Sequence, residues 1–385
     1  MIALGLSFGL MREIRVGVVG CGLMGREFAS AAARWCHLLD LPFRPVIVAV
    51  CDPIASAREW FSRNIPTVEL ATDDRSALLA HDLEAVYVAV PHNLHEAVYL
   101  DVLRAGKHLM AEKPVGIDLA ASQAITTEVH KHPELTVRVS SEFPFFPGAQ
   151  RIIKLVESGA FGKVFEVKAG FLHSSDLDPG KPMNWKRRIA TNGAYGCMGD
   201  LGLHVLHLPL RFGWRPRNVR ALLSRIHTER PGADGALETC ETWDNAILAC
   251  ETADFPMVLE MKRIAPGEMN TWYLEVHGTK LSAKFSTKQA KTLYTLPFTA
   301  GEPQAWRVED IGYASAYPTI TGGIFEFGFS DAILQMWAAF CDEIVNGYEM
   351  IGPFRCAYPE EAFVTHEVFT GALFSQAKNK VWELA

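Results

Sequence analysis

The chain has 385 residues, enough for two or three domains with a large buried core. Hydrophobic residues make up 49% and charged residues 21%, as in ordinary soluble globular proteins, and the formal net charge is −7. This balance, without a basic run interleaved with aromatic residues, excludes nucleic acid as an expected partner.

Cysteine usage and hydropathy favour a cytoplasmic protein without a membrane segment. The 8 cysteines are scattered and form no C-x-x-C pair, which is typical of reduced, mostly buried thiols. No apolar run reaches the roughly 18 residues needed to span a bilayer. The opening MIALGLSFGLM lacks the basic region and cleavage site of a signal peptide. We predict Met11 as the natural start, because a good strand follows it at once.

Up to about residue 140, apolar strands alternate with helices. Val-rich runs such as IRVGVVG are typical of parallel strands buried on both faces. Alternating strand–helix units predict an N-terminal Rossmann domain, a doubly wound parallel sheet, over residues 12–142. The expected strands are 14–20, 46–52, 85–91, 108–112 and 135–140, and the expected helices are 23–36, 54–64, 94–106 and 118–131.

The pattern changes over residues 143–385. Several strand-like stretches alternate apolar and polar residues, which suits an antiparallel sheet with one face packed on helices. We predict a C-terminal α+β domain, built on a large, mainly antiparallel open sheet, for substrate binding and oligomerisation. Its expected strands are 163–173, 216–227, 242–253, 256–264, 270–277 and 280–286; helices are expected at 148–158, around 197–208, and at 329–346 and 358–378, with a loop at 174–192.

The stretch VGVVGCGLMG carries glycines at 20, 22 and 25 in a G-x-G-x-x-G pattern. Because the motif follows a buried strand and opens a helix, it predicts a dinucleotide-binding turn, with Leu23 and Met24 beside the cofactor. Gly20 permits the tight turn, Gly22 lets the backbone approach a pyrophosphate, and Gly25 lets helix and strand pack closely. A Gly-rich structural turn is the alternative.

Asp52 ends the second strand, 27 residues beyond Gly25. A carboxylate there accepts hydrogen bonds from the ribose hydroxyls and repels a 2′-phosphate, which favours NAD over NADP. Arg58 lies close enough in sequence to complicate this preference. The alternative role for Asp52 is to cap the helix that follows.

The stretch GKHLMAEKPVG runs from a buried strand directly into Glu112, Lys113 and Pro114. Carboxyl ends of parallel strands border the ligand crevice, so Lys113 is expected where a nicotinamide ring would lie. A partly buried ammonium there can bind a substrate oxygen and ease loss of its proton. A solvated lysine at a strand end is the alternative.

The stretch CMGDLGLHVLHL places Asp200, His204 and His207 on one face of a predicted helix. Three interpretations are open: a metal site, a proton-handling site, or polar groups satisfied inside the core. No further ligand cluster supports a metal, so we expect none. We assign His207 to the core. His204 can act as a base near neutral pH.

The order of these motifs resembles that of the Gfo/Idh/MocA oxidoreductases, which include glucose–fructose oxidoreductase and inositol dehydrogenase. The resemblance rests on G-x-G-x-x-G, VPHNLH (90–95), AGKHLMAEKP (105–114) and GDLGLH (199–204), and it covers nearly the whole chain.

The resemblance implies roles for individual residues. Lys113 would be catalytic, and Asp200 and His204 would contact the reacting sugar. Glu112 would lie near the nicotinamide ribose, and Lys113–Pro114 would be a cis peptide. The residues implied along the cofactor are Pro91, Asn93 and His95.

The chain also departs from the family pattern. Pro144 stands where many members carry an arginine, and His207 stands where aspartate is frequent. We expect both to border the substrate pocket. In the loop before the Asp200 helix, Trp185 is a candidate for stacking on a sugar or the cofactor.

Together these features predict a cytoplasmic, homodimeric or homotetrameric NAD-dependent dehydrogenase acting on a sugar, sugar derivative or inositol. His204 would be the base, Lys113 its electrostatic partner and Asp200 the orienting carboxylate; an exchange of roles between Lys113 and His204 stays open. The alternatives are a non-catalytic NAD-binding regulatory protein and a redox-neutral, NAD-using glycosidase.

Overall fold

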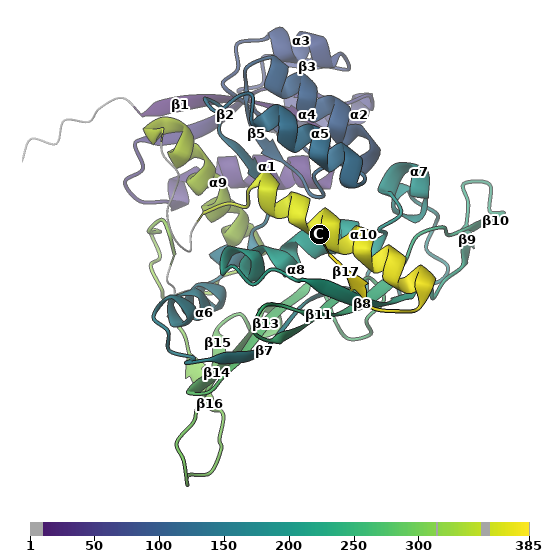
Figure 1. The fold of residues 1–385 in the computed structure, drawn as a ribbon. Coiled ribbons are helices and arrows are strands. Elements are labelled where there is room, and N and C mark those ends of the chain that lie inside the picture. The colour runs from purple at the N-terminus through teal and green to yellow at the C-terminus, as the bar shows by residue number, and fades with distance from the viewer. Residues whose placement is uncertain (1–10, 313–314, 348–354, 385) are drawn as a thin grey trace, which may run out of the picture.

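The computed structural model describes residues 11–312, 315–347 and 355–384. The prediction that the chain starts at Met11 concerns residues outside these ranges. Two layers of sheet and helix are stacked on one another, with the N-terminal sheet above and a larger sheet below (Figure 1). Within the described ranges, no helix is long and apolar enough to cross a lipid bilayer.

The first sheet has six parallel strands in the order β3-β2-β1-β4-β5-β6, which confirms the predicted doubly wound Rossmann fold. The strand β4 and the last four residues of β1 are buried, because helices cover both faces of the sheet. Its strands are β1 (Arg12–Val19), β2 (Phe43–Cys51), β3 (Leu70–Thr72), β4 (Ala85–Val88), β5 (His108–Ala111) and β6 (Val137–Val139). Its helices are α1 (Leu23–Ala33), α2 (Ala55–Asn64), α3 (Arg75–Ala80), α4 (His95–Arg104) and α5 (Leu119–Val129), with short 3₁₀ turns η1 (Trp35–His37) and η2 (His92–Leu94).

The second sheet has nine strands in the order β16-β15-β14-β13-β7-β12-β11-β8-β17, and only β7 and β12 pair in parallel among them. The predicted, mainly antiparallel open sheet is therefore confirmed. Its strands are β7 (Val164–Leu172), β8 (Asn218–Ser224), β11 (Asn245–Glu251), β12 (Pro256–Lys262), β13 (Thr271–Gly278), β14 (Leu281–Ser286), β15 (Thr292–Pro297), β16 (Arg307–Asp310) and β17 (Trp382–Glu383).

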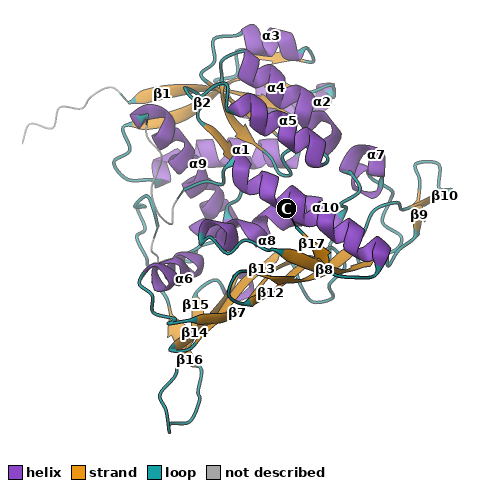
Figure 2. Cartoon of the chain, viewed as in Figure 1, coloured by secondary structure: helices purple, strands orange, loops and turns teal. Residues whose placement is uncertain are grey.

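Helices cover one face of this second sheet and leave the other uncovered (Figure 2). In β11 every second residue is buried, and these small and apolar side chains face the helices. The main helices are α6 (Pro147–Glu157), α8 (Cys197–Arg211), α9 (Phe329–Asn346) and α10 (Pro359–Lys378). Smaller elements are η3 (Phe143–Phe145), η4 (Trp185–Arg187), α7 (Ile189–Asn192), η5 (Thr287–Gln289), and a separate ribbon of β9 (Glu229–Pro231) and β10 (Leu237–Thr239).

Helix α9 returns to the first sheet and joins the two layers. The indole of Trp337 stacks on Phe28 of α1 with ring centroids 3.7 Å apart, and Asp331 pairs with Arg34. This packing lies beside β2, far from α9 in sequence (Figure 1). The site forms where Lys113, after β5 of the first layer, contacts Asp200 of α8.

Candidate functional site

A cavity of about 530 Å³ lies between the two layers, and residues from both line it. From the first sheet and its helices come Leu23, Met24, Glu27, Glu112, Lys113, Ser140 and Glu142. From the second come Phe171, His173, Ser175, Lys186, Asp200, Leu201, His204, Arg263, Asn270 and Phe329. The predicted catalytic residues Lys113, Asp200 and His204 are therefore brought to one cavity.

Lys113 follows β5 directly, and the Lys113–Pro114 peptide bond is cis, as the resemblance implies. Its ammonium donates to the main-chain oxygen of Asp200 at 2.8 Å and lies 3.3 Å from that residue's Oδ1. Burial lowers the pKa of Lys113, while the carboxylates of Glu112 and Glu142 act in the opposite direction. The amine therefore lies at the cavity wall with its charge only partly compensated.

Asp200, in the first turn of α8, is the shared counter-ion of three cations. Besides Lys113, Lys186 donates to both of its carboxylate oxygens at 2.9 and 3.1 Å, and Arg263 donates to Oδ2. Burial lowers the pKa of Lys186 well below its ordinary value, and the charges of Arg263 and Lys113 add to this effect. The orienting contact expected between Asp200 and His204 is not among the hydrogen bonds of the described residues.

His204 lies one turn further along α8, with its ring between Phe143 and Phe171 at centroid distances of 5.1 and 5.3 Å. Its Nδ1 is 3.3 Å from the Ser141 hydroxyl. The indole N–H of Trp272 on β13 donates to the His204 carbonyl at 2.8 Å and so fixes the helix on the sheet. Burial lowers the pKa of His204 well below its ordinary value, and Lys113 and His173 lower it further, so the ring is neutral at pH 7.

The glycine motif has the geometry that a dinucleotide requires. A Cβ on Gly20, where φ is +99°, would lie 2.2 Å from the Ala89 carbonyl oxygen, and one on Gly25 would lie 2.3 Å from the Gly20 oxygen. A Cβ on Gly22 would meet nothing within 4 Å. Gly22 precedes α1, whose N-terminus has no side-chain cap. The free N–H groups of that helix end can therefore receive a pyrophosphate.

Asp52 stands at the end of β2 beside this loop. Its carboxylate accepts from the backbone N–H of Cys21 and of Ile54, both at 2.8 Å. The contact with Ile54 matches the local capping role that we considered, and the contact with Cys21 ties the carboxylate to the phosphate loop. Arg58 turns toward the main-chain oxygen of Asp52.

The other residues expected along the cofactor differ in their surroundings. Glu112 lines the cavity and accepts from the Tyr87 hydroxyl at 2.8 Å. Pro91 is half-buried and Asn93 is exposed. The His95 ring is fully buried, with its nitrogens 2.6 and 2.9 Å from the carbonyl oxygens of Pro114 and Val90, so its side chain contacts the Lys-Pro turn rather than the cavity.

Three residues expected near the substrate are not among the described residues that line the cavity. Trp185 packs edge-on against His92 with centroids 4.9 Å apart. Pro144 is buried within η3. His207 is fully buried beside Arg211 and Glu361, which confirms its assignment to the core. The expectation that Pro144 and His207 border the pocket is wrong for this cavity, because both are buried and neither is among the described residues that line it.

Sequence reasoning missed several polar residues of the cavity wall, notably Glu142, His173 and Arg263. His173 and Arg263 stand immediately after a strand and Glu142 stands three residues after one, and that position was an available signal. The charged neighbours extend below the cavity, where the buried Asp176 accepts from Arg187, Arg263 and Lys181. No cluster of three or more His, Cys, Asp or Glu side chains suited to a metal ion occurs in the described ranges.

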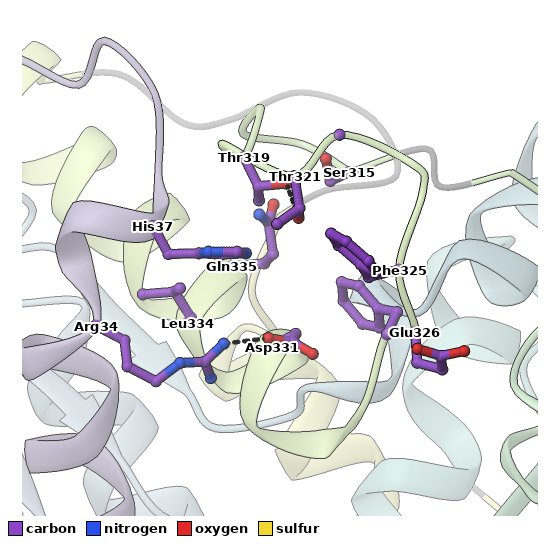
Figure 3. Close-up of a pocket in the computed structure, with 12 residues that line it drawn as sticks. Arg34, His37, Ser315, Thr319, Thr321, Phe325, Glu326, Asp331, Leu334 and Gln335 are labelled. Carbon is purple, nitrogen blue, oxygen red and sulfur yellow. Dashed lines mark hydrogen bonds and ion pairs between the residues drawn. The ribbon is translucent and has the colours of Figure 1, made fainter.

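A smaller cavity of about 220 Å³ lies where α9, the end of α1 and residues 315–327 meet (Figure 3). Among its polar groups, Arg34 pairs with Asp331, and the hydroxyls of Thr319 and Thr321 are 3.3 Å apart. None of the predicted site residues lines it.

Comparison with known proteins gives two family matches that follow each other along the chain. Residues 14–140 match the GFO_IDH_MocA oxidoreductase family, described as having an NAD-binding Rossmann fold. Residues 149–284 match the GFO/IDH/MocA C-terminal domain.

Among individual relatives, levoglucosan dehydrogenase of Pseudarthrobacter phenanthrenivorans is 26% identical over 337 residues, 78% of this chain and 85% of that protein. An inositol 2-dehydrogenase of Corynebacterium glutamicum is 29% identical over 159 residues, 41% of this chain and 45% of that protein.

Solved structures share the fold. A levoglucosan dehydrogenase in complex with NADH superposes with a TM-score of 0.87 and 22% identity, covering 97% of this chain and all 100% of that one. An NAD-binding oxidoreductase of Klebsiella pneumoniae gives 0.86 at 22% identity, over 97% and 99% of the two chains. The two successive family matches, on the two sheets described above, show that this chain belongs to the GFO/IDH/MocA family of oxidoreductases and that its first domain is an NAD-binding Rossmann domain.

Proposed function

We propose that the chain is an NAD-dependent dehydrogenase that oxidises a secondary hydroxyl of a sugar, sugar derivative or inositol. The observation that carries this proposal is the convergence of Lys113 and His204, from the two layers of the fold, on one cavity beside the N-terminus of α1. The names of the relatives support the substrate class, because levoglucosan and inositol are both polyhydroxylated rings.

Oxidation of an alcohol requires that a proton leave the oxygen and a hydride leave the carbon. Bound NAD would supply the hydride acceptor at the nicotinamide ring. His204, neutral at pH 7, is the base that takes the hydroxyl proton, an effect worth about 10²–10⁴ in rate. The Lys113 ammonium hydrogen-bonds the same oxygen and stabilises the negative charge that develops on it.

Asp200 acts on the amines rather than on the imidazole. Its carboxylate holds Lys113, Lys186 and Arg263 together, so it fixes where the Lys113 ammonium points. In a partly buried site, this fixed geometry lets the charge act on the substrate without reorganisation.

The finer parts of the proposal concern the cofactor and the assembly. NAD is preferred over NADP because the Asp52 carboxylate faces the phosphate loop.

We also propose that copies of the chain associate through the uncovered face of the large sheet, where Phe165, Leu222 and Val308 are exposed. A cytoplasmic location fits the eight free cysteines, of which only Cys36 is exposed.

The test is turnover of NAD with a panel of sugars, anhydrosugars and inositols. The variants Lys113→Ala and His204→Ala should each lose at least about 10²-fold in kcat while still binding NADH. Matched replacements of an exposed lysine and histidine, Lys163→Ala and His130→Ala, should leave turnover unchanged. NADH binding without turnover on any polyol would refute the dehydrogenase proposal, as would glycosidic cleavage without net NADH formation.

A further inference from the structure

The cavity wall holds a buried carboxylate that the mechanism above does not use. Glu142 follows β6 and precedes η3, and its side chain lines the cavity with only 4% of its surface exposed. In the described part of the chain, the His204 imidazole lies near it, at 3.9 Å from Oε2 to Nδ1. A buried carboxyl group needs partners: Glu142 hydrogen-bonds its own backbone, and the His204 imidazole is the basic side chain within 4 Å of it among the described residues.

The imidazole is oriented so that its two nitrogens face different surroundings. Nδ1 faces the Ser141 hydroxyl at 3.3 Å and the Glu142 carboxylate at 3.9 Å, and the ring is held edge-on between two phenylalanines. Nε2, on the opposite side of the ring, has no hydrogen-bond partner among the described residues and is the nitrogen left for a substrate hydroxyl. His204 therefore stands between the substrate position and Glu142.

An isolated histidine in this position would be a weak base. Burial, the Lys113 ammonium and His173 oppose a positive charge on the ring, and they hold the pKa of His204 well below its ordinary value. A carboxylate near Nδ1 offsets that cost, because the ring then passes a proton on instead of holding a charge. The 3.9 Å separation must shorten by about 1 Å for a hydrogen bond, as catalytic contacts do when a substrate binds.

We propose that Glu142 is a positioning residue that receives, through His204, the proton released from the substrate hydroxyl. This inference rests on the proposed dehydrogenase function. In the step, the substrate O–H bond breaks and an Nε2–H bond forms; the Nδ1–H bond breaks and an O–H bond forms on Glu142. Hydride departure from the same carbinol carbon completes the oxidation, and the proton later leaves Glu142 for water.

Burial raises the pKa of Glu142 to about 7; the charge of Glu112 also raises it, and the Lys113 ammonium lowers it. Glu142 can therefore gain and lose a proton near neutral pH. The titratable and charged groups that face the Glu142–His204 pair from the packed elements are Tyr87 of β4, Glu112 and Lys113 after β5, His173 after β7 and His207 of α8.

The kinetic test compares Glu142→Gln with Glu142→Asp. In the wild type, kcat should fall as the pH drops through about 7, because protonated Glu142 accepts no further proton. This fall is the acid limb of the pH profile of kcat. Glutamine keeps the shape but takes up no proton, so Glu142→Gln should lower kcat about 10–100-fold at pH 8, leave KM and NADH binding unchanged, and abolish the limb near pH 7. Glu142→Asp should restore a pH-dependent limb. An unchanged limb in Glu142→Gln would overturn the proposal.

An infrared titration separates this inference from the proposed function. The wild-type protein should show a protonated carboxyl C=O band that disappears as the pH rises through about 7, and Glu142→Gln should lack this band. If polyols are oxidised but the band or the kinetic limb is absent, the role of Glu142 fails while the dehydrogenase function stands. If no polyol is oxidised, the proposed function fails. The infrared band then still tests Glu142, and its absence from the wild type would overturn the inference about this residue.

Discussion

Replacing Asp200 by asparagine tests how the site holds three cations against one carboxylate. In Asp200→Asn, Arg263 keeps its bond to Asp176 at 2.6 Å, and Lys113 keeps the nearby charges of Glu112 and Glu142. Lys186 loses the carboxylate that it binds at 2.9 Å. Leaving one charge of a buried pair alone costs about 3–5 kcal/mol. Because the Lys186 side chain is 30% exposed, we expect a smaller loss of unfolding free energy, about 2–3 kcal/mol at pH 7.

The pH dependence of this loss has a definite sign. Without Asp200, the pKa of Lys186 in the folded protein falls further below that of the unfolded chain. The unfolded chain then binds more protons, so the stability of Asp200→Asn should rise with pH and approach that of the wild type toward pH 10.

The measurement is urea unfolding followed by circular dichroism and tryptophan fluorescence. The double variant Asp200→Asn/Lys186→Met removes the unpaired cation and should recover at least half of the loss. The exposed Asp254→Asn should stay within about 0.5 kcal/mol of wild type. A change below about 0.5 kcal/mol in Asp200→Asn, or a double variant as unstable as the single one, would refute the assignment of Asp200 as the shared counter-ion.

Three further predictions concern the cofactor loop and its support. Gly22→Ala should keep the fold and weaken NADH binding about tenfold, as measured by calorimetry. Gly25→Ala should lose about 1–3 kcal/mol of unfolding free energy in urea titration, since its Cβ would meet backbone. Asp52→Ser should raise kcat/KM for NADP relative to NAD about tenfold; an unchanged ratio would contradict the role of Asp52. Burial lowers the pKa of His95 to about 4 from 6.5, so the unfolding free energy should fall as the pH drops from 6.5 toward 4, by up to about 1.4 kcal/mol per pH unit. Urea titrations at several pH values should show a smaller dependence of the unfolding free energy on pH in His95→Gln.

The predicted strands and helices of the Rossmann domain were largely confirmed because their signals are local. Apolar runs of Val and Ile mark β1, β2 and β4, and the glycine motif sits at the predicted turn. The elements that escaped prediction, such as β3 and α3, have three and six residues, too few for hydrophobic periodicity to appear. One signal was overlooked: Asp74, whose side chain caps α3 by accepting from the Ser76 N–H.

The last strands of the second sheet could not be predicted from sequence for a different reason. The strands β15, β16 and β17 are partly exposed at or near the sheet edges, so their side chains carry little hydrophobic pattern. The segment 174–192, predicted as a loop because of its Gly, Pro and Asp content, also contains the short turns η4 and α7. Trp185 lies in η4 but packs on His92, a contact between residues far apart in sequence that no local pattern indicates.

The sequence by itself determined the class of fold, the phosphate loop, the Lys-Pro turn and the helix carrying Asp200 and His204. Each of these depends on neighbouring residues, through backbone conformation or helical spacing. Only the tertiary structure decided which side chains meet: that Asp200 binds Lys186 and Arg263 instead of His204, that His95 supports the Lys-Pro turn, and that Glu142 stands behind His204. Such contacts join residues 14 to 63 positions apart, and they arise from tertiary packing, which no short stretch of sequence encodes.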